Sequence, residues 1–189
     1  MIPIPERMRH LNVYRGYAVP WGVLVADGVV HFAINREEIR DRMISEDRCS
    51  ICGTKLLRGR WFVGGPGSAF HPRGAYIDMP MHSECKDYSL TACPYLAAPH
   101  YGKEIGPTKA QQINGPLVLV DATTIPDRPS LFVAVFATGQ RMTAGSPFQR
   151  HVVPKRPFLK TEFWRHGARL DPVTAEPEAR LLAAQIEAQ

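Results

Sequence analysis

Two pairs of side chains with the chemistry of metal ligands stand out in the sequence. Cys49 and Cys52 form a C-x-x-C-G motif, and His82 and Cys85 follow after 29 intervening residues. Thiolate and imidazole are the donors of four-coordinate structural zinc sites, in which Cys₃His is a usual set. The glycine after Cys52 permits the backbone conformation that completes the turn. The spacing therefore predicts a Zn²⁺ site made of Cys49, Cys52, His82 and Cys85.

A site with four protein ligands leaves no open position for water, so we expect the zinc ion to be structural and not catalytic. One alternative is that Cys49 and Cys52 are small core residues and His82 lies on the surface. A redox dithiol is the other alternative. It is less favoured because this motif follows a predicted helix and precedes a predicted hairpin, whereas thioredoxin-like dithiols lie in a strand-to-helix turn.

The fourth cysteine, Cys93, lies eight residues after Cys85, which places it about 80° further round an ideal helix. This offset favours a buried core cysteine over a further ligand of the same metal. A pocket near Cys93, with His100 as a base, is the enzymatic alternative. The sequence shows no Ser/His/Asp, paired-carboxylate or P-loop arrangement, so it favours a protein that is not an enzyme.

A second candidate site is the basic segment 141–170, which carries seven Lys/Arg residues against one Glu, a net charge of +6. Such a surface attracts nucleic acid or an acidic protein surface. The rings of Phe148, Phe158, Phe163 and Trp164 are interleaved with the cations and could stack on bases. The alternative is that the rings face the core and the cations form a solvated face. The candidate anion-binding residues are Arg150, Lys155, Arg156, Lys160 and Arg165.

The elements that must position these residues follow from periodicity and turn signals. Two strands within 16–34 meet at the turn Asp27-Gly28. A helix is predicted over 35–46 with Asn35 as its cap, followed by a hairpin over 54–63, a loop over 64–80 and a helix over 81–93 that ends before Pro94. Residues 97–115 are predicted to form a loop, and 116–124, 130–139 and 156–164 to form strands. The last element is a C-terminal helix with Leu181, Leu182 and Ile186 on its apolar side.

These elements predict an α+β fold, with a small mixed or antiparallel β-sheet, a treble-clef-like zinc module and a C-terminal helix. We expect one domain over 1–189, with the zinc module at about 49–93, the β-rich part at about 116–165 and the helix at about 172–188. A chain of 189 residues buries about two thirds of its unfolded surface, so it does not need metal merely to fold. No apolar run is long enough to span a membrane and no signal peptide is present, so the cytoplasm is expected.

Several segments together resemble a family of short bacterial and phage-related proteins that has no established activity. They are "PERMRHLNVYRGYAVPW", "RCSICG", "FVGGPGS", "HSECKDYSLTACPYL" and "EFWRHG". The resemblance spans most of residues 5–100 and is weaker afterwards. It implies that the two ligand pairs are a shared metal-binding pattern and that Cys93 is a shared cysteine before proline.

Treble-clef scaffolds also occur in HNH nucleases, which hold a catalytic metal with histidines on and behind the hairpin. The predicted hairpin "TKLLRGRWFVGG" contains no histidine, and no Asp precedes His71. The sequence therefore does not indicate a nuclease. It favours a zinc-stabilised basic binding protein, with a protein-interaction or regulatory module as the alternative.

Overall fold

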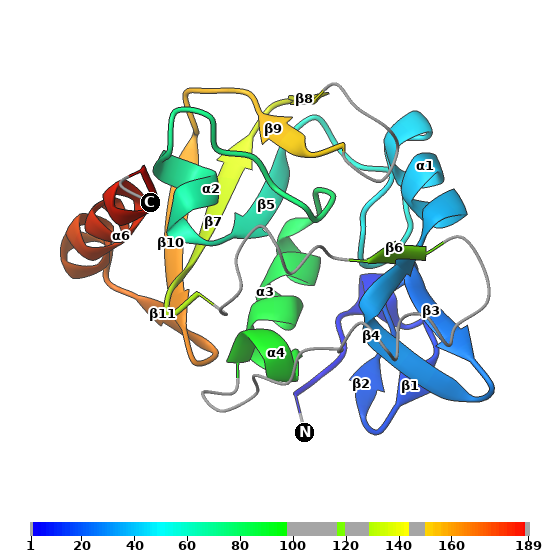
Figure 1. Cartoon of the computed structure of the whole chain (residues 1–189). Helices are drawn as coiled ribbons and strands as arrows, with labels where there is room; N and C mark the ends of the chain where they lie inside the picture. The colour runs from blue at the N-terminus through cyan, green and yellow to red at the C-terminus, as the bar shows by residue number, and fades with distance from the viewer. Residues whose placement is uncertain (1, 98–116, 120–128, 144–149, 188–189) are drawn as a thin grey trace.

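A four-stranded antiparallel sheet forms the centre of the molecule (Figure 1). The computed structural model describes residues 2–97, 117–119, 129–143 and 150–187. The strand order is β11 (Ala168–Leu170), β10 (Lys160–Arg165), β7 (Phe132–Ala137) and β5 (Arg60–Gly64). The run "FVAVFA" in β7 is apolar throughout, which suits a strand that is covered on both faces. The prediction of a buried central strand over 130–139 is confirmed.

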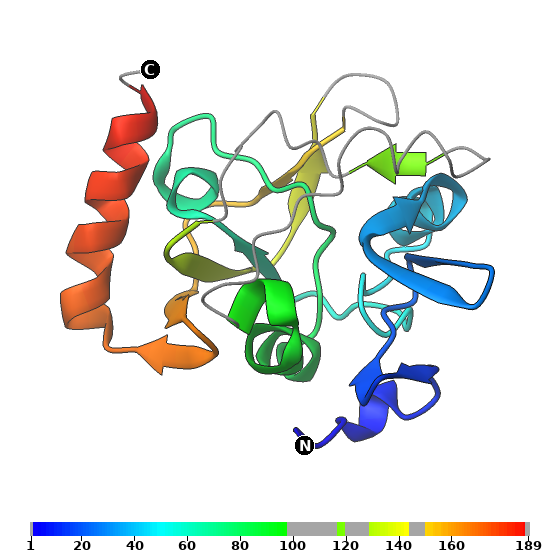
Figure 2. The same cartoon turned by 60° about the horizontal axis from the view of Figure 1, so that its bottom comes forward.

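Different helices cover the two faces of this sheet (Figure 2). Phe132 and Ala134 of β7 pack in one buried cluster with α3 (Ser83–Ala92), which is followed by the short helix α4 (Pro94–Ala97). Val133 and Val135 pack in a second cluster with α2 (Pro66–Phe70) and α6 (Pro172–Glu187). The alternation of side chains along β7 therefore divides the core into two layers.

The N-terminal strands lie in two small sheets, which Figure 1 shows mostly in blue beside the central sheet. They are β1 (Val13–Tyr14) with β2 (Tyr17–Ala18), and β3 (Val23–Ala26) with β4 (Val29–Arg36) and β6 (Leu117–Leu119). The hairpin of β3 and β4 turns at Asp27 and Gly28, both with positive φ, as the sequence predicted. β6 pairs with β4 and not with β7. The remaining elements are η1 (Glu6–Met8), α1 (Glu37–Ser45), β8 (Gln140–Met142) and β9 (Val152–Pro154).

Two local predictions in the first third of the chain are wrong. Asn35 lies inside β4, opposite Val23 and Val118, and the residue before α1 is Arg36, which makes no side-chain capping bond. The predicted hairpin over 54–63 does not form, because β5 pairs with β7 instead. The backbone of Gly59 lies against the ring of Phe136 at the end of that pairing.

Two later predictions also need correction. The predicted loop over 64–80 contains α2. The C-terminal helix is present and Leu182 packs against the second core cluster, but Leu181 is 63 % exposed, and the buried positions of the helix are Ala175, Ala179 and Ala183. Small residues on this face suit close packing of α6 against α2. The predicted loop over 97–115 lies almost entirely outside the described residues, as does the side chain of Ile186.

The overall prediction of an α+β fold with a small antiparallel sheet and a C-terminal helix is confirmed. Within the ranges that the structure describes, no helix has the length and apolar character that crossing a membrane requires.

Candidate metal centre

The first half of the centre is a tight turn between α1 and β5. The N–H of Gly53 donates to the carbonyl of Cys49 at 3.0 Å, and the N–H of Cys49 donates to the carbonyl of Thr54 at 2.9 Å. Gly53 has φ +71°, a conformation that glycine adopts without the steric cost of a side chain. Arg48 and Lys55 form an antiparallel bridge across the base of the turn. These bonds hold the side chains of Cys49 and Cys52 on a common site.

The second half is the start of α3. His82 is the residue that precedes the helix and Cys85 lies in its first turn. Met81, just before His82, exchanges two backbone hydrogen bonds of 2.9 Å with Trp61 of β5. The central sheet therefore fixes the position at which this helix begins, and with it the positions of both ligands.

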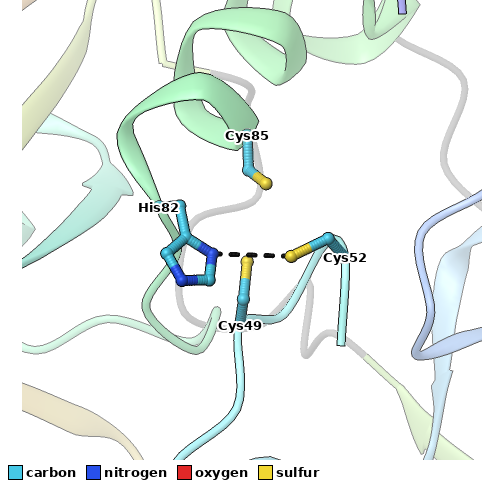
Figure 3. A group of neighbouring side chains, drawn as sticks. All are labelled: Cys49, Cys52, His82 and Cys85. Carbon is cyan, nitrogen blue, oxygen red and sulfur yellow. Dashed lines mark hydrogen bonds between the residues drawn. The ribbon is translucent and has the colours of Figure 1, made fainter. Parts of the chain in front are cut away.

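The two halves bring four ligand atoms together (Figure 3). The sulfur atoms of Cys49, Cys52 and Cys85 and a ring nitrogen of His82 all lie within 4.8 Å of one another. All four residues are buried, the most accessible being His82 at 7 %. The separation of Cys52 Sγ and His82 Nδ1 is 3.4 Å. Tetrahedral zinc with Cys₃His ligation requires separations of about 3.5 to 3.8 Å, so this pair is close to the spacing of such a site.

The imidazole of His82 is held in the orientation that metal binding requires. Its Nε2 lies 3.2 Å from the carbonyl of Lys55, while Nδ1 faces the sulfur atoms. With the proton on Nε2 donated to that carbonyl, the lone pair of Nδ1 is directed at the centre of the cluster. A backbone acceptor in this role is a common feature of histidine ligands.

The titration of the cluster reflects this proximity. Hydrogen bonds with Cys49 and then Cys52 raise the pKa of His82 to about 9. Hydrogen bonds from Cys49 and Cys85 lower the pKa of Cys52, and those with Cys49 and Cys52 raise the pKa of Cys85. Without a metal, the protons on His82, Cys52 and Cys85 therefore depend on one another. A cation at the centre would displace those protons.

A buried ion pair lies beside the centre, and sequence reasoning missed it. The ammonium of Lys86 contacts the carboxylate of Glu162 on β10 and lies 4.2 Å from the ring centroid of Trp61 and 5.3 Å from that of Trp164. Glu162 also accepts from Trp164 Nε1 at 3.2 Å. Sequence spacing does not indicate this pair, because Lys86 and Glu162 lie 76 positions apart.

The remaining cysteine, Cys93, takes no part in the metal group. It caps the C-terminal end of α3 and is half-buried, so it is less enclosed than the predicted core cysteine. His100, the base suggested for an enzymatic site near Cys93, lies outside the described residues.

The predicted anion-binding cations differ in their surroundings. Arg156 donates to the carbonyls of Ala69 and His71 at 2.7 and 3.1 Å, and Arg165 pairs with Glu178. Arg150 is half-buried. Lys155 and Lys160 are both exposed.

The aromatic residues of the same segment are mostly in the core. Phe163 and Trp164 are 1 % and 7 % exposed, so the alternative in which these rings face the core is confirmed for both. Phe158 is partly buried against the second core cluster, and Phe148 lies outside the described residues. Base stacking by Phe163 or Trp164 would require them to leave the core.

Comparison of the chain with protein-family models, with curated proteins and with solved structures gave no match.

Proposed function

We propose that this chain is a zinc-braced binding protein, in which Cys49, Cys52, His82 and Cys85 hold one structural Zn²⁺ ion. The observation that carries the proposal is the convergence of four buried ligand atoms within 4.8 Å, with the Nε2 atom of His82 already engaged by a carbonyl. Three thiolates and one imidazole favour zinc over the hard cations, which prefer oxygen ligands. A cytoplasmic setting, where thiols stay reduced, is part of this proposal.

The role proposed for the ion is mechanical. Four protein ligands complete its coordination, and the burial of all four leaves no approach for a substrate. The ion would fasten the turn at Cys49–Gly53 to the start of α3, two parts of the chain that also share a hydrogen bond of 3.1 Å from the N–H of Ser50 to the carbonyl of Pro80. Kinship with the short bacterial and phage-related proteins that the motifs resemble belongs to this proposal as well, and it rests on those motifs alone.

Elemental analysis of purified protein tests the metal. We expect one zinc per chain, and we expect Cys49→Ser to lower the zinc content to well under half. Cys93→Ser is the matched control, because Cys93 is outside the metal group, and it should keep the full zinc content. A wild-type protein without zinc, or a Cys49→Ser variant that retains it, would exclude the proposed site.

An anionic partner, such as nucleic acid, is the proposed binding function. Its support is the net charge of +5 and the exposure of Lys155 and Lys160, which lie on either side of a turn that enters β10. Arg58 is also exposed. It lies near the same end of the sheet, since its neighbour Gly59 contacts Phe136 and Phe136 is the residue opposite Lys160. Cations of this kind would contact phosphates without reading base sequence.

Binding to random-sequence DNA and RNA at several salt concentrations tests this second part. We expect affinity to fall with rising salt, and the double reversal Lys155→Glu/Lys160→Glu to weaken it at least tenfold at low salt. Arg15→Glu, at the distant β1–β2 turn, makes a charge change of the same kind and should have a smaller effect. No binding at low salt, or an equal loss in the control, would exclude this surface.

A further inference from the structure

The turn at Cys49–Gly53, which supplies two of the metal ligands, accepts hydrogen bonds at its backbone from residues outside it. Three consecutive carbonyls each accept one hydrogen bond: Ile51 from the N–H of Trp21 at 2.8 Å, Cys52 from Nε2 of His10 at 2.9 Å, and Gly53 from Nη1 of Arg48 at 2.9 Å. Two of these donors belong to residues 2–22, which we call the N-terminal arm. The arm is therefore bonded to the same short turn that supplies two of the metal ligands.

The arm also packs on the turn and on α3. The ring of Trp21 lies directly against the α-carbon of Gly53. Met8 and Ala18 are 1 % and 3 % exposed and lie in the same buried cluster as Cys49, Cys52 and Cys85. The N–H of Ala18 donates to the hydroxyl of Tyr88 on α3 at 3.0 Å, and Arg7 pairs with Glu84 at 3.2 Å. The arm thus contacts both halves of the metal centre.

Little within the arm would keep it ordered without these contacts. Its regular structure consists of the three-residue helix η1 and the strands β1 and β2, which have two residues each. A two-stranded hairpin of this length is not stable by itself in water. The central sheet differs, because β7 is paired on both sides and buried within two core layers.

We propose that metal occupancy controls the docking of the N-terminal arm, so that the metal centre is a latch for residues 2–22. The inference rests on the proposed zinc site. With a metal bound, the turn holds the carbonyls of Ile51 and Cys52 where Trp21 and His10 reach them. Without it, four ligands lose their common partner, the turn relaxes, and the arm detaches. Detachment would expose Met8, Ala18 and the surface of α3 around Tyr88, an apolar surface that the metal-loaded protein buries.

Hydrogen exchange of the metal-loaded protein, before and after removal of zinc by a chelator, tests the latch. We expect amide protection in peptides of the arm to fall at least tenfold on chelation, together with that of the turn. Protection of β7 should stay within twofold. Zinc content is measured on the same samples.

The outcomes separate the two proposals. A purified protein without zinc excludes both the site and the latch. Zinc that is present and then removed while the arm stays protected excludes the latch alone. Chelation that deprotects β7 as much as the arm also excludes it, because the metal would then support the whole fold.

Linkage gives an independent measurement on the intact protein, since docking and metal binding must influence each other equally. His10→Ala removes the hydrogen bond to the Cys52 carbonyl, and a hydrogen bond of this kind corresponds to about a fivefold change in an equilibrium constant. We expect the Kd for Zn²⁺, measured by competition with a chromophoric chelator, to rise by about that factor. Arg9→Ala, at the adjacent exposed residue, is the control and should leave the Kd unchanged. An unchanged Kd in His10→Ala would overturn the latch.

Discussion

The indole ring of Trp21 covers the α-carbon of Gly53, so closely that a Cβ atom at residue 53 would lie 2.6 Å from Cδ2 of the ring. Gly53 also has φ +71°. A side chain at this position is therefore opposed both by the backbone conformation and by an aromatic neighbour. The absence of a side chain at Gly53 therefore permits both the backbone conformation of the turn and the contact with Trp21 of the N-terminal arm.

We expect Gly53→Ala to lower the free energy of unfolding by about 3 kcal/mol, of which about 1 kcal/mol reflects the left-handed conformation and the rest the overlap with Trp21. Urea denaturation of the zinc-loaded protein measures this change. Gly28→Ala is the matched control, because Gly28 has φ +73° and nothing within 4 Å of the added Cβ. It should cost about 1 kcal/mol. Equal losses of unfolding free energy in the two variants would contradict the prediction, because the ring of Trp21 would then move aside without an energetic penalty.

The buried ion pair between Lys86 and Glu162 leads to a second prediction. Lys86→Met removes the cation and leaves Glu162, which is 6 % exposed, with Trp164 Nε1 and Arg169 as its remaining partners. We expect a loss of about 3 kcal/mol in the free energy of unfolding, because an incompletely compensated buried carboxylate is costly. Adding Glu162→Gln to this variant should recover part of the loss.

Lys160→Met is the control for that measurement, because Lys160 lies on the same strand and the same sheet face as Glu162 but is exposed. It should change the free energy of unfolding by no more than about 0.5 kcal/mol. If the double variant were less stable than Lys86→Met alone, the carboxylate of Glu162 would be stabilising without its lysine, and the prediction would fail.

Sequence patterns predicted the parts of this protein whose geometry is local. The ligands of each pair lie within one turn or at the start of one helix, so their spacing alone indicates that the side chains converge. The Asp27-Gly28 turn is local in the same way, since two adjacent residues with positive φ define it. The helix over 81–93 was also predicted, because its end is marked by Pro94.

The parts that were wrong depend on partners far along the chain. Residues 54–63 resemble a hairpin, but β5 finds a more apolar partner in β7. Asn35 resembles a helix cap, but pairing with Val118 of β6 extends β4 past it. On α6 Leu182 packs against the core as predicted, but Leu181 is exposed, and Ala175 and Ala179 lie in the cluster shared with the neighbouring helix α2. Local propensity contains no information on any of these partners.

Two buried tyrosines allow a comparison of how a hydroxyl with and without a hydrogen bond affects stability. Among the residues that the structure describes, none forms a hydrogen bond with the hydroxyl of Tyr76, although the residue is only 1 % exposed. The hydroxyl of Tyr88 accepts from the N–H of Ala18. We expect Tyr76→Phe to raise the free energy of unfolding by about 1 kcal/mol and Tyr88→Phe to lower it by about 1 kcal/mol. Changes of the same sign in urea denaturation would contradict this assignment.

The burial of Tyr76 also predicts how stability depends on alkaline pH. Burial raises the pKa of its phenol well above the ordinary value of 10, and the opposing effect of Arg156 is smaller. In the unfolded chain the phenol ionises near pH 10, whereas in the folded protein it stays neutral. The contribution of a raised pKa is complete below the unfolded value and is lost as the pH rises from there toward the folded value.

The wild-type protein should therefore lose stability above pH 10 relative to Tyr76→Phe, by about 1.4 kcal/mol for each pH unit. Denaturant unfolding of both proteins between pH 7 and 11.5 measures the difference in their free energies of unfolding. The other tyrosines and the lysines are the same in both proteins, so their contributions cancel in this difference. From pH 7 to 9 the difference should be constant, because the Tyr76 phenol is neutral in both states there. A difference that stays constant up to pH 11.5 would show that the phenol of Tyr76 ionises in the folded protein as readily as in the unfolded chain, and so that it reaches water.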